Sequence, residues 1–233
     1  MRGSSARLGG QTVLVGDAKG RVLGFQRIRV KADAEERRLS PTHVFAPHGA
    51  AVTAISPAPR GKTFVTADAK GEIVARYATN ERTLVRANAG APVLGLTVGA
   101  KADGMVARVA DGLVSLGLRA PHPEFSWKAL FSRIQYEGYD RPEYVWQSSG
   151  ATDDFEPKLS LGPLVFGTLK GTLYAMLFAI PVALSAALYT ALFAPAGLRS
   201  FVKPVVEIMA ALPSVVVGFL AGIWLAPMIE RHT

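Results

Sequence analysis

The residues from Leu173 to Phe193, LYAMLFAIPVALSAALYTALF, run for 21 positions without a charge and are interrupted only by Pro181. A helix rises about 1.5 Å per residue, so such a run can cross the roughly 30 Å hydrocarbon layer of a bilayer. Core helices of soluble proteins usually carry a polar stripe, whereas this run offers only tyrosine, serine and threonine. We therefore predict a transmembrane helix over about 166–193, rather than a buried core helix.

A second apolar run extends from Val205 to Leu225 and contains one charge, Glu207. The short connector between the two runs carries Arg199 and Lys203 and no acidic residue. Positive residues in short loops favour the cytoplasmic side of a membrane. The sequence thus predicts a second helix over about 205–226 and, with the first, a transmembrane hairpin whose bend faces the cytoplasm.

The positive charge of the chain lies mainly in its first 160 residues, which hold 22 of the 26 basic and 16 of the 18 acidic residues. A basic domain can bind nucleic acid, but these basic residues are dispersed through strand-like sequence and are not interleaved with aromatic residues. A solvated surface near an anionic membrane is the interpretation we favour, with no nucleic-acid partner. The absence of cysteine excludes a disulfide framework and a thiolate metal site.

Two segments of the N-terminal half repeat one another. Thr12–Phe25 and Thr63–Arg76 share the tetrapeptide Asp-Ala-Lys-Gly at the same position. Each reads as a β-rich run, a tight turn and a second β-rich run, which predicts a β-hairpin. A weaker third copy spans Met105–Leu118, with its turn at Asp111-Gly112.

The repeats recur at close to 40 residues. Gly71 and Gly112 lie 41 residues apart, as do the strand-like runs Val52–Ile55 and Val93–Leu96. A period of this length with four short strands per unit is typical of a β-propeller blade. The first interval is ten residues longer, and we expect the inserted loop at the charged stretch Lys31–Ser40.

The segment His48–Ile73 has a leading histidine, a Ser-Pro pair before a glycine turn, and a closing Asp-x-x-Gly hairpin. It resembles a degenerate WD40-type repeat, in which Tyr77-Ala78 stands where that family has Trp-Asp. The resemblance implies an incomplete, WD40-like β-propeller over residues 1–120, because a closed ring needs roughly four to eight blades. In such a blade we expect a hydrogen bond between His48 and Asp68 that fixes the turn.

Residues 121–160 differ in composition and contain Trp127, Trp146 and no long apolar run. Phe125–Ile134 predicts a short amphipathic helix, and Ser148–Asp154 predicts a turn-rich connector. We expect a linker here, and its aromatic and acidic residues suit either the water–membrane interface or a recognition surface.

Three motifs mark the C-terminal part: Gly-Thr-Leu-Lys at 167–170, Ile-Pro at 180–181, and Lys-Pro-x-x-Glu-x-Met-Ala-x-Leu-Pro-Ser at 203–214. Through them residues 156–227 closely resemble the opening of the MetI-like permease domain of bacterial phosphate-type ABC importers. The resemblance is greatest to the long permease subunits that carry a WD40-like insert ahead of the permease core. It implies a multi-domain chain, in which the β-propeller-like half precedes an all-α transmembrane hairpin that begins a permease domain over 161–233.

The resemblance also implies the surroundings of the chain. We expect a multi-pass protein of the bacterial inner membrane whose N-terminal domain is periplasmic. Its partners would be a second permease subunit, a cytoplasmic ATPase subunit, a periplasmic phosphate-binding protein and membrane lipid. Because such permeases begin with a helix ahead of the insert and continue with further spans, we expect a truncated piece of a longer subunit.

Five residues of the apolar half are candidates for transport or helix packing. The charge inside the second span is a functional candidate by default, although it also stands at ion-pair spacing from Lys203. Prolines interrupt helices that pack in larger bundles, and small residues four apart allow close helix approach. The candidates are Glu207, Pro181, Pro213, Gly218 and Gly222.

No catalytic constellation can be argued from the sequence. The P-loop pattern G-x-x-x-x-G-K-[ST] does not occur, and the four histidines are scattered without ligand spacing. We expect no enzyme activity, no cofactor and no metal. The alternative function is a membrane-anchored β-propeller interaction module without transport activity.

Overall fold

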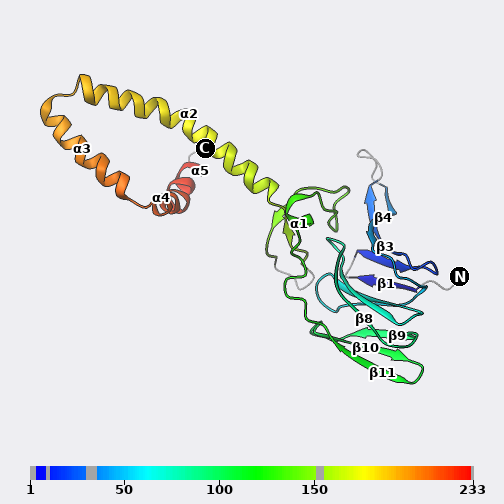
Figure 1. The fold of residues 1–233 in the computed structure, drawn as a ribbon. Helices are drawn as coiled ribbons and strands as arrows, with labels where there is room; N and C mark the ends of the chain where they lie inside the picture. Colours follow the sequence, from blue (N-terminus) through cyan, green and yellow to red (C-terminus); the bar gives the residue numbers. More distant parts are fainter. Residues whose placement is uncertain (1–3, 9–10, 30–35, 151–154, 232–233) are drawn as a thin grey trace. The chain divides into compact units, whose positions relative to one another are not determined.

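The computed structural model describes residues 4–8, 11–29, 36–150 and 155–231. The chain divides into two compact units, Met1–Thr168 and Leu169–Thr233, and the division falls inside the long helix α2 (Gly162–Leu192). The first unit is built from antiparallel sheets and the second is helical (Figure 1).

Besides one two-stranded sheet, the described part of the β-rich unit contains three larger antiparallel sheets, A to C, each with its strands in chain order. Sheet A consists of β1 (Ser4–Leu8), β2 (Thr12–Gly16), β3 (Val22–Arg29) and β4 (Arg37–Phe45). Sheet B consists of β5 (Val52–Pro57), β6 (Thr63–Asp68), β7 (Glu72–Tyr77) and β8 (Arg82–Asn88). Sheet C consists of β9 (Gly95–Val98), β10 (Gly104–Val109) and β11 (Gly112–Gly117). The three hairpins predicted from the repeats are therefore confirmed as β2–β3, β6–β7 and β10–β11.

The three sheets stack through their apolar faces. The first strands, β1, β5 and β9, lie next to one another. One buried cluster, which includes Leu14, Phe45 and Phe64, joins sheet A to sheet B. Another, which includes Ile73 and Met105, joins sheet B to sheet C. Within the described residues the sheets form no closed ring.

The repeated Asp-Ala-Lys-Gly turns adopt the same structure in sheets A and B. The Oδ1 atom of Asp68 accepts hydrogen bonds from the backbone N–H groups of Lys70 and Glu72, both at 2.9 Å. Asp17 makes the equivalent bonds in sheet A. Gly71 has φ +89°, a left-handed conformation that glycine adopts without steric cost. This turn chemistry explains why the tetrapeptide repeats.

The carbonyl of each turn glycine holds the loop that enters the next sheet. The N–H of His48 donates to the Gly20 carbonyl, and that of Ala89 donates to the Gly71 carbonyl, both at 2.9 Å.

Two boundaries differ from the prediction. Residues 37–40 of the expected insertion belong to strand β4, whereas residues 30–35 lie outside the described residues. The strand predicted over Val93–Leu96 is observed as β9, which begins only at Gly95. The N–H of Val93 donates instead to the carbonyl of Asp68 in sheet B.

The predicted linker packs against sheets A and B. We call residues 121–150 and 155–160 the strap; it contains α1 (Trp127–Phe131), β12 (Trp146–Gln147) and β13 (Lys158–Leu159). The predicted helix over Phe125–Ile134 is thus shorter than expected. Ile134 and Tyr136 are almost fully buried, so the strap belongs to the β-rich unit. Of the expected connector Ser148–Asp154, residues 151–154 lie outside the described residues.

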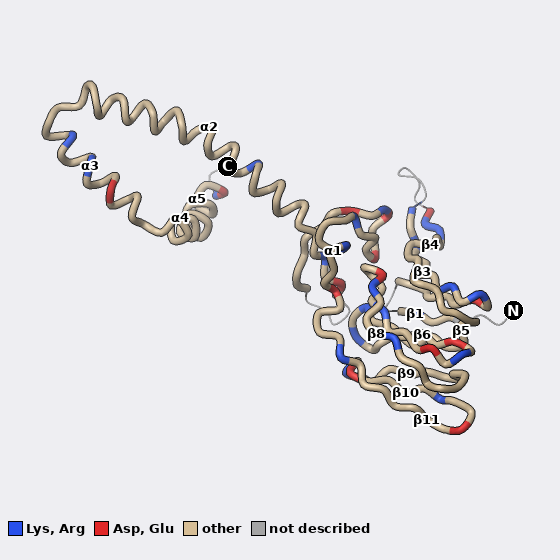
Figure 2. Tube along the Cα trace, viewed as in Figure 1, with Lys and Arg blue, Asp and Glu red and all other residues tan. Residues whose placement is uncertain are grey.

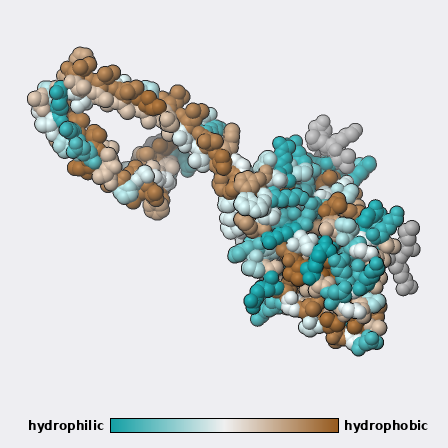
Figure 3. Space-filling view, viewed as in Figure 1, coloured by the Kyte–Doolittle hydropathy of each residue, from teal (hydrophilic) through white to brown (hydrophobic). Residues whose placement is uncertain are grey.

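The apolar half forms one long helix and a series of shorter ones. Helix α2 has no buried residue and continues through Pro181, which was expected to interrupt it. It carries almost no charge (Figure 2) and is predominantly hydrophobic (Figure 3). Helix α3 (Ala196–Ala211) begins directly after Pro195. Arg199 and Lys203 therefore lie on a helix, and the prediction that they lie in a connecting loop was wrong.

The predicted continuous helix over 205–226 was also wrong. It is divided between the end of α3 and the elements α4 (Ser214–Leu220), η1 (Ala221–Leu225) and α5 (Ala226–Glu230). The chain bends by 89° between α3 and the following elements. Leu212 takes an extended conformation with ψ +132°, because the ring of Pro213 disfavours helical geometry in the residue before it.

Within the described residues, one helix, α2, is long and apolar enough to cross a membrane. A second span is obtained if α3 and the bent segment Ser214–Glu230 count as one.

Candidate functional site

A groove between α2 and α3 contains one of the predicted site residues, Glu207. Arg199 joins the two helices, since its Nε and Nη2 donate to the carbonyls of Thr190 (3.2 Å) and Ala191 (2.9 Å). Those carbonyls lie in the last turn of α2, where no intrahelical N–H is available to them. The guanidinium therefore caps α2 and holds the start of α3 beside it.

One polar row of α3 lines this groove. Arg199, Lys203 and Glu207 follow one another at intervals of four residues and so lie on one side of the helix. The groove has a volume of about 770 Å³, and its other wall consists of small side chains of α2. These are Ala183, Ala186, Ala187, Thr190 and Ala191. The groove thus combines two cations and one carboxylate with a wall of methyl groups.

The structure does not bring the other predicted residues to this groove. Pro181 lies within α2, and Pro213 lies at the bend after α3. Gly218 is in α4 and Gly222 in η1, and a Cβ added at either would meet no atom within 4 Å. Their role in helix packing remains a prediction.

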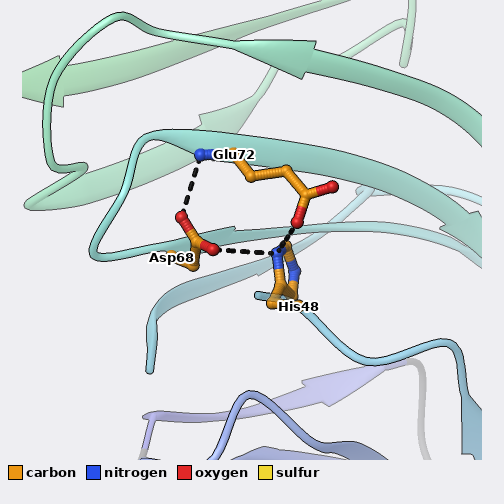
Figure 4. A group of neighbouring side chains, drawn as sticks. All are labelled: His48, Asp68 and Glu72. Atoms are coloured by element: carbon orange, nitrogen blue, oxygen red, sulfur yellow. Dashed lines mark hydrogen bonds and ion pairs between the residues drawn. The ribbon is translucent and has the colours of Figure 1, made fainter. Parts of the chain in front are cut away.

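A second cluster lies in the β-rich unit and is centred on His48 (Figure 4). Its Nε2 lies 2.7 Å from the Thr66 hydroxyl and its Nδ1 lies 3.0 Å from Glu72 Oε2. Asp68 Oδ2 is 3.7 Å from Nδ1, which is longer than a hydrogen bond. The expected hydrogen bond between His48 and Asp68 is thus not formed, and the dashed line between them in Figure 4 marks the longer ion-pair contact. Asp68 fixes the turn through backbone N–H groups instead.

The His48 cluster has the donor types of a metal site, but its surroundings favour a structural network. The ligand atoms of His48, Asp68 and Glu72 lie within 4.8 Å of one another. Two arginines already supply positive charge: Arg76 donates to the Thr66 hydroxyl, and Arg86 pairs with Glu72 at 2.5 Å. Burial, and secondly the charge of Arg76, lower the pKa of His48.

A third group of polar side chains is buried where the strap meets the sheets. Lys62 Nζ lies 2.6 Å from Glu137 Oε2, and the Thr12 hydroxyl donates to Glu137 Oε1 at 2.6 Å. Glu156 accepts from the Thr79 hydroxyl and, at 2.8 Å, from the Glu137 N–H. Sequence reasoning missed these residues, because the strap has no internal repeat that would align its acidic residues with the sheets.

No family model matches the chain, and no curated protein matches it. One similar solved structure is that of the computationally designed Ika4 protein. It is 16% identical, with a TM-score of 0.39, and the match covers 48% of this chain and 64% of that chain. This structural similarity is too weak to indicate a shared fold or function. The fold is that of a chain of stacked antiparallel sheets followed by a long, exposed apolar helix.

Proposed function

We propose that this chain is a membrane-spanning permease subunit of an ABC importer for inorganic phosphate. The observation that carries the proposal is helix α2, which is 31 residues long, apolar, and exposed along its whole length. In water that surface would be costly to expose, whereas in lipid it is the favourable one. The family and the substrate in this proposal come only from the resemblance carried by the three sequence motifs at 167–170, 180–181 and 203–214.

The polar row of α3 supports a permease rather than a simple anchor. An anchor needs only an apolar surface, and ionisable residues inside a membrane span are costly unless they serve a function or find a partner. In the proposal, further helices of the transporter cover the exposed faces of α2 and the glycines of α4 and η1. In the same proposal, the antiparallel sheets belong to an incomplete, WD40-like propeller domain on the periplasmic side.

The proposed setting is the bacterial inner membrane with multi-pass topology. The partners in this proposal are a second permease subunit, a cytoplasmic ATPase subunit, a periplasmic phosphate-binding protein and lipid. ATP hydrolysis is assigned to the separate ATPase, because the chain contains no P-loop pattern.

The test is uptake of radiolabelled phosphate by cells whose own copy of the gene has been deleted. Complementation with the wild-type gene should restore uptake, and Leu177→Arg should not, because an arginine in the middle of α2 opposes insertion. The matched control is Leu113→Arg on the exposed strand β11, which should restore uptake. Unchanged uptake after deletion would contradict the transport proposal.

A second candidate function is a membrane-anchored interaction module. It is favoured by the finding that only α2 passes as an unbroken span within the described residues. In that case deletion leaves phosphate uptake unchanged, while Leu177→Arg releases the chain from the membrane.

A further inference from the structure

A groove on sheet A collects arginine side chains, and the described residues of its lining include no acidic one. It has a volume of about 470 Å³ and is open to solvent. Its lining consists of Arg7, Gln11, Val13, Arg27, Arg37 and Leu39. The strand register explains this grouping, because Arg7 stands opposite Val13 and Arg27 stands opposite Leu39. The β1–β2 and β3–β4 hairpins of sheet A thus bring their arginines to the same groove.

The groove arginines differ from their neighbours on the β3–β4 hairpin. Arg29 pairs with Asp140 at 3.7 Å and Arg38 pairs with Glu36 at 3.2 Å. Within the described part of the chain, Arg27 and Arg37 form no ion pair or hydrogen bond through their side chains. Figure 2 shows basic residues on this hairpin. Two of the three guanidinium groups that line the groove, those of Arg27 and Arg37, are therefore left without a carboxylate among the described residues.

The lining also offers an apolar surface between the charges. Leu39 on β4 is 57% exposed, and Val13 on β2 also belongs to the lining. Guanidinium groups bind phosphate oxygens in pairs of parallel hydrogen bonds, and the amide of Gln11 adds a further donor. We propose that this groove binds a phosphate-bearing anion, either a free phosphate or the phosphodiester headgroup of a lipid. The proposal does not depend on the transport function.

The experiment uses the full chain in neutral detergent micelles and isothermal titration calorimetry. Two probes distinguish the sources: inorganic phosphate, and glycerophosphoglycerol as the water-soluble headgroup of phosphatidylglycerol. Tighter binding of inorganic phosphate identifies a free anion as the ligand, and tighter binding of the phosphodiester identifies a headgroup. Binding of neither probe overturns the proposal.

Variants separate a site from general attraction to a basic surface. Arg27→Gln and Arg37→Gln should each weaken binding about tenfold, the effect of losing one charged hydrogen-bonding group. The matched control Arg38→Gln removes the same charge from the same hairpin outside the groove and should change affinity less than twofold. Equal weakening by all three variants would contradict a defined site. Because the three side chains are exposed, hydrogen exchange of sheet A should be the same in every variant.

Discussion

At the scale of single residues, the buried carboxyl of Glu156 makes the stability of the β-rich unit depend on pH. Burial raises its pKa above the usual 4.5, and the hydrogen bonds from Thr79 and Glu137 oppose this shift only in part. The folded protein therefore holds this proton more strongly than the unfolded chain does. The contribution of Glu156 is most favourable at and below about pH 4.5 and is lost as the pH rises through the raised pKa.

We predict that Glu156→Gln stabilises the β-rich unit at pH 8, by about 1 kcal/mol, and has no such effect at pH 4. A glutamine can keep both hydrogen bonds, since its oxygen accepts from the Glu137 N–H and its amide donates to the Thr79 hydroxyl. Pulse proteolysis of the full chain in urea measures the free energy of unfolding at each pH. The control is Glu36→Gln, whose side chain is exposed. If the difference in the free energy of unfolding between Glu156→Gln and the wild type were the same at pH 4 and pH 8, the raised pKa of Glu156 would be contradicted.

At the scale of elements, the Asp-Ala-Lys-Gly turn holds each sheet to the next. A Cβ at Gly71 would lie 2.7 Å from the backbone oxygen of Ala91, and the residue also has a left-handed φ of +89°. Gly61 has a similar φ of +71°, but no atom lies within 4 Å of its added Cβ. The two glycines therefore separate the cost of the conformation from the cost of the close approach.

We predict that Gly61→Ala costs about 1–2 kcal/mol, the price of a left-handed alanine. Gly71→Ala should cost at least about 1 kcal/mol more, because the loop that enters sheet C must move. In Gly71→Ala, hydrogen exchange should accelerate in the peptide that contains Ala89, because the N–H of Ala89 donates to the Gly71 carbonyl. Equal effects of the two substitutions would show that the close contact is unimportant.

The bend after α3 is a second feature at this scale. We predict that Pro213→Ala allows α3 and α4 to join, because the restriction on Leu212 and the missing N–H are both removed. Spin labels at Ser200 and Met228 would then separate toward about 42 Å, the length of a continuous helix at 1.5 Å per residue. The control Pro204→Ala lies inside α3, which is already continuous, and should leave the distance unchanged. An unchanged distance in Pro213→Ala would mean that other contacts impose the bend.

At the scale of the whole molecule, the periodic parts of the structure were the predictable ones. The hairpins followed from a repeated turn whose hydrogen bonds are local, and α2 followed from its long apolar sequence without a charge between Leu173 and Phe193. The sequence did not reveal that α3 starts at Ala196, because Arg199 was assigned to a loop by its charge. Its actual partners, the carbonyls at the end of α2, exist only once the chain has turned.

The strap could not be predicted for a related reason. Glu137 and Glu156 are partners of Lys62 and Thr79, which lie 75 and 77 residues earlier in the chain. No local periodicity connects residues so far apart. The candidate site residue Glu207 was found from its charge alone, whereas the methyl wall opposite it emerged only from the packing of α2 and α3.

The central claim is that α2 lies in lipid, and the absence of cysteine allows a direct test. Single cysteines are introduced at Ala179, in the middle of α2, and at Ser149, an exposed residue of the strap. Both side chains are exposed in this chain, so Ala179 is shielded only where lipid, or the further membrane helices proposed to cover α2, surrounds it. The measurement is labelling by a membrane-impermeant maleimide in opened membranes, before and after detergent. We predict that the cysteine at 179 reacts only after detergent has been added, whereas the cysteine at 149 reacts both before and after. Equal labelling of the two cysteines before detergent is added would contradict a membrane span.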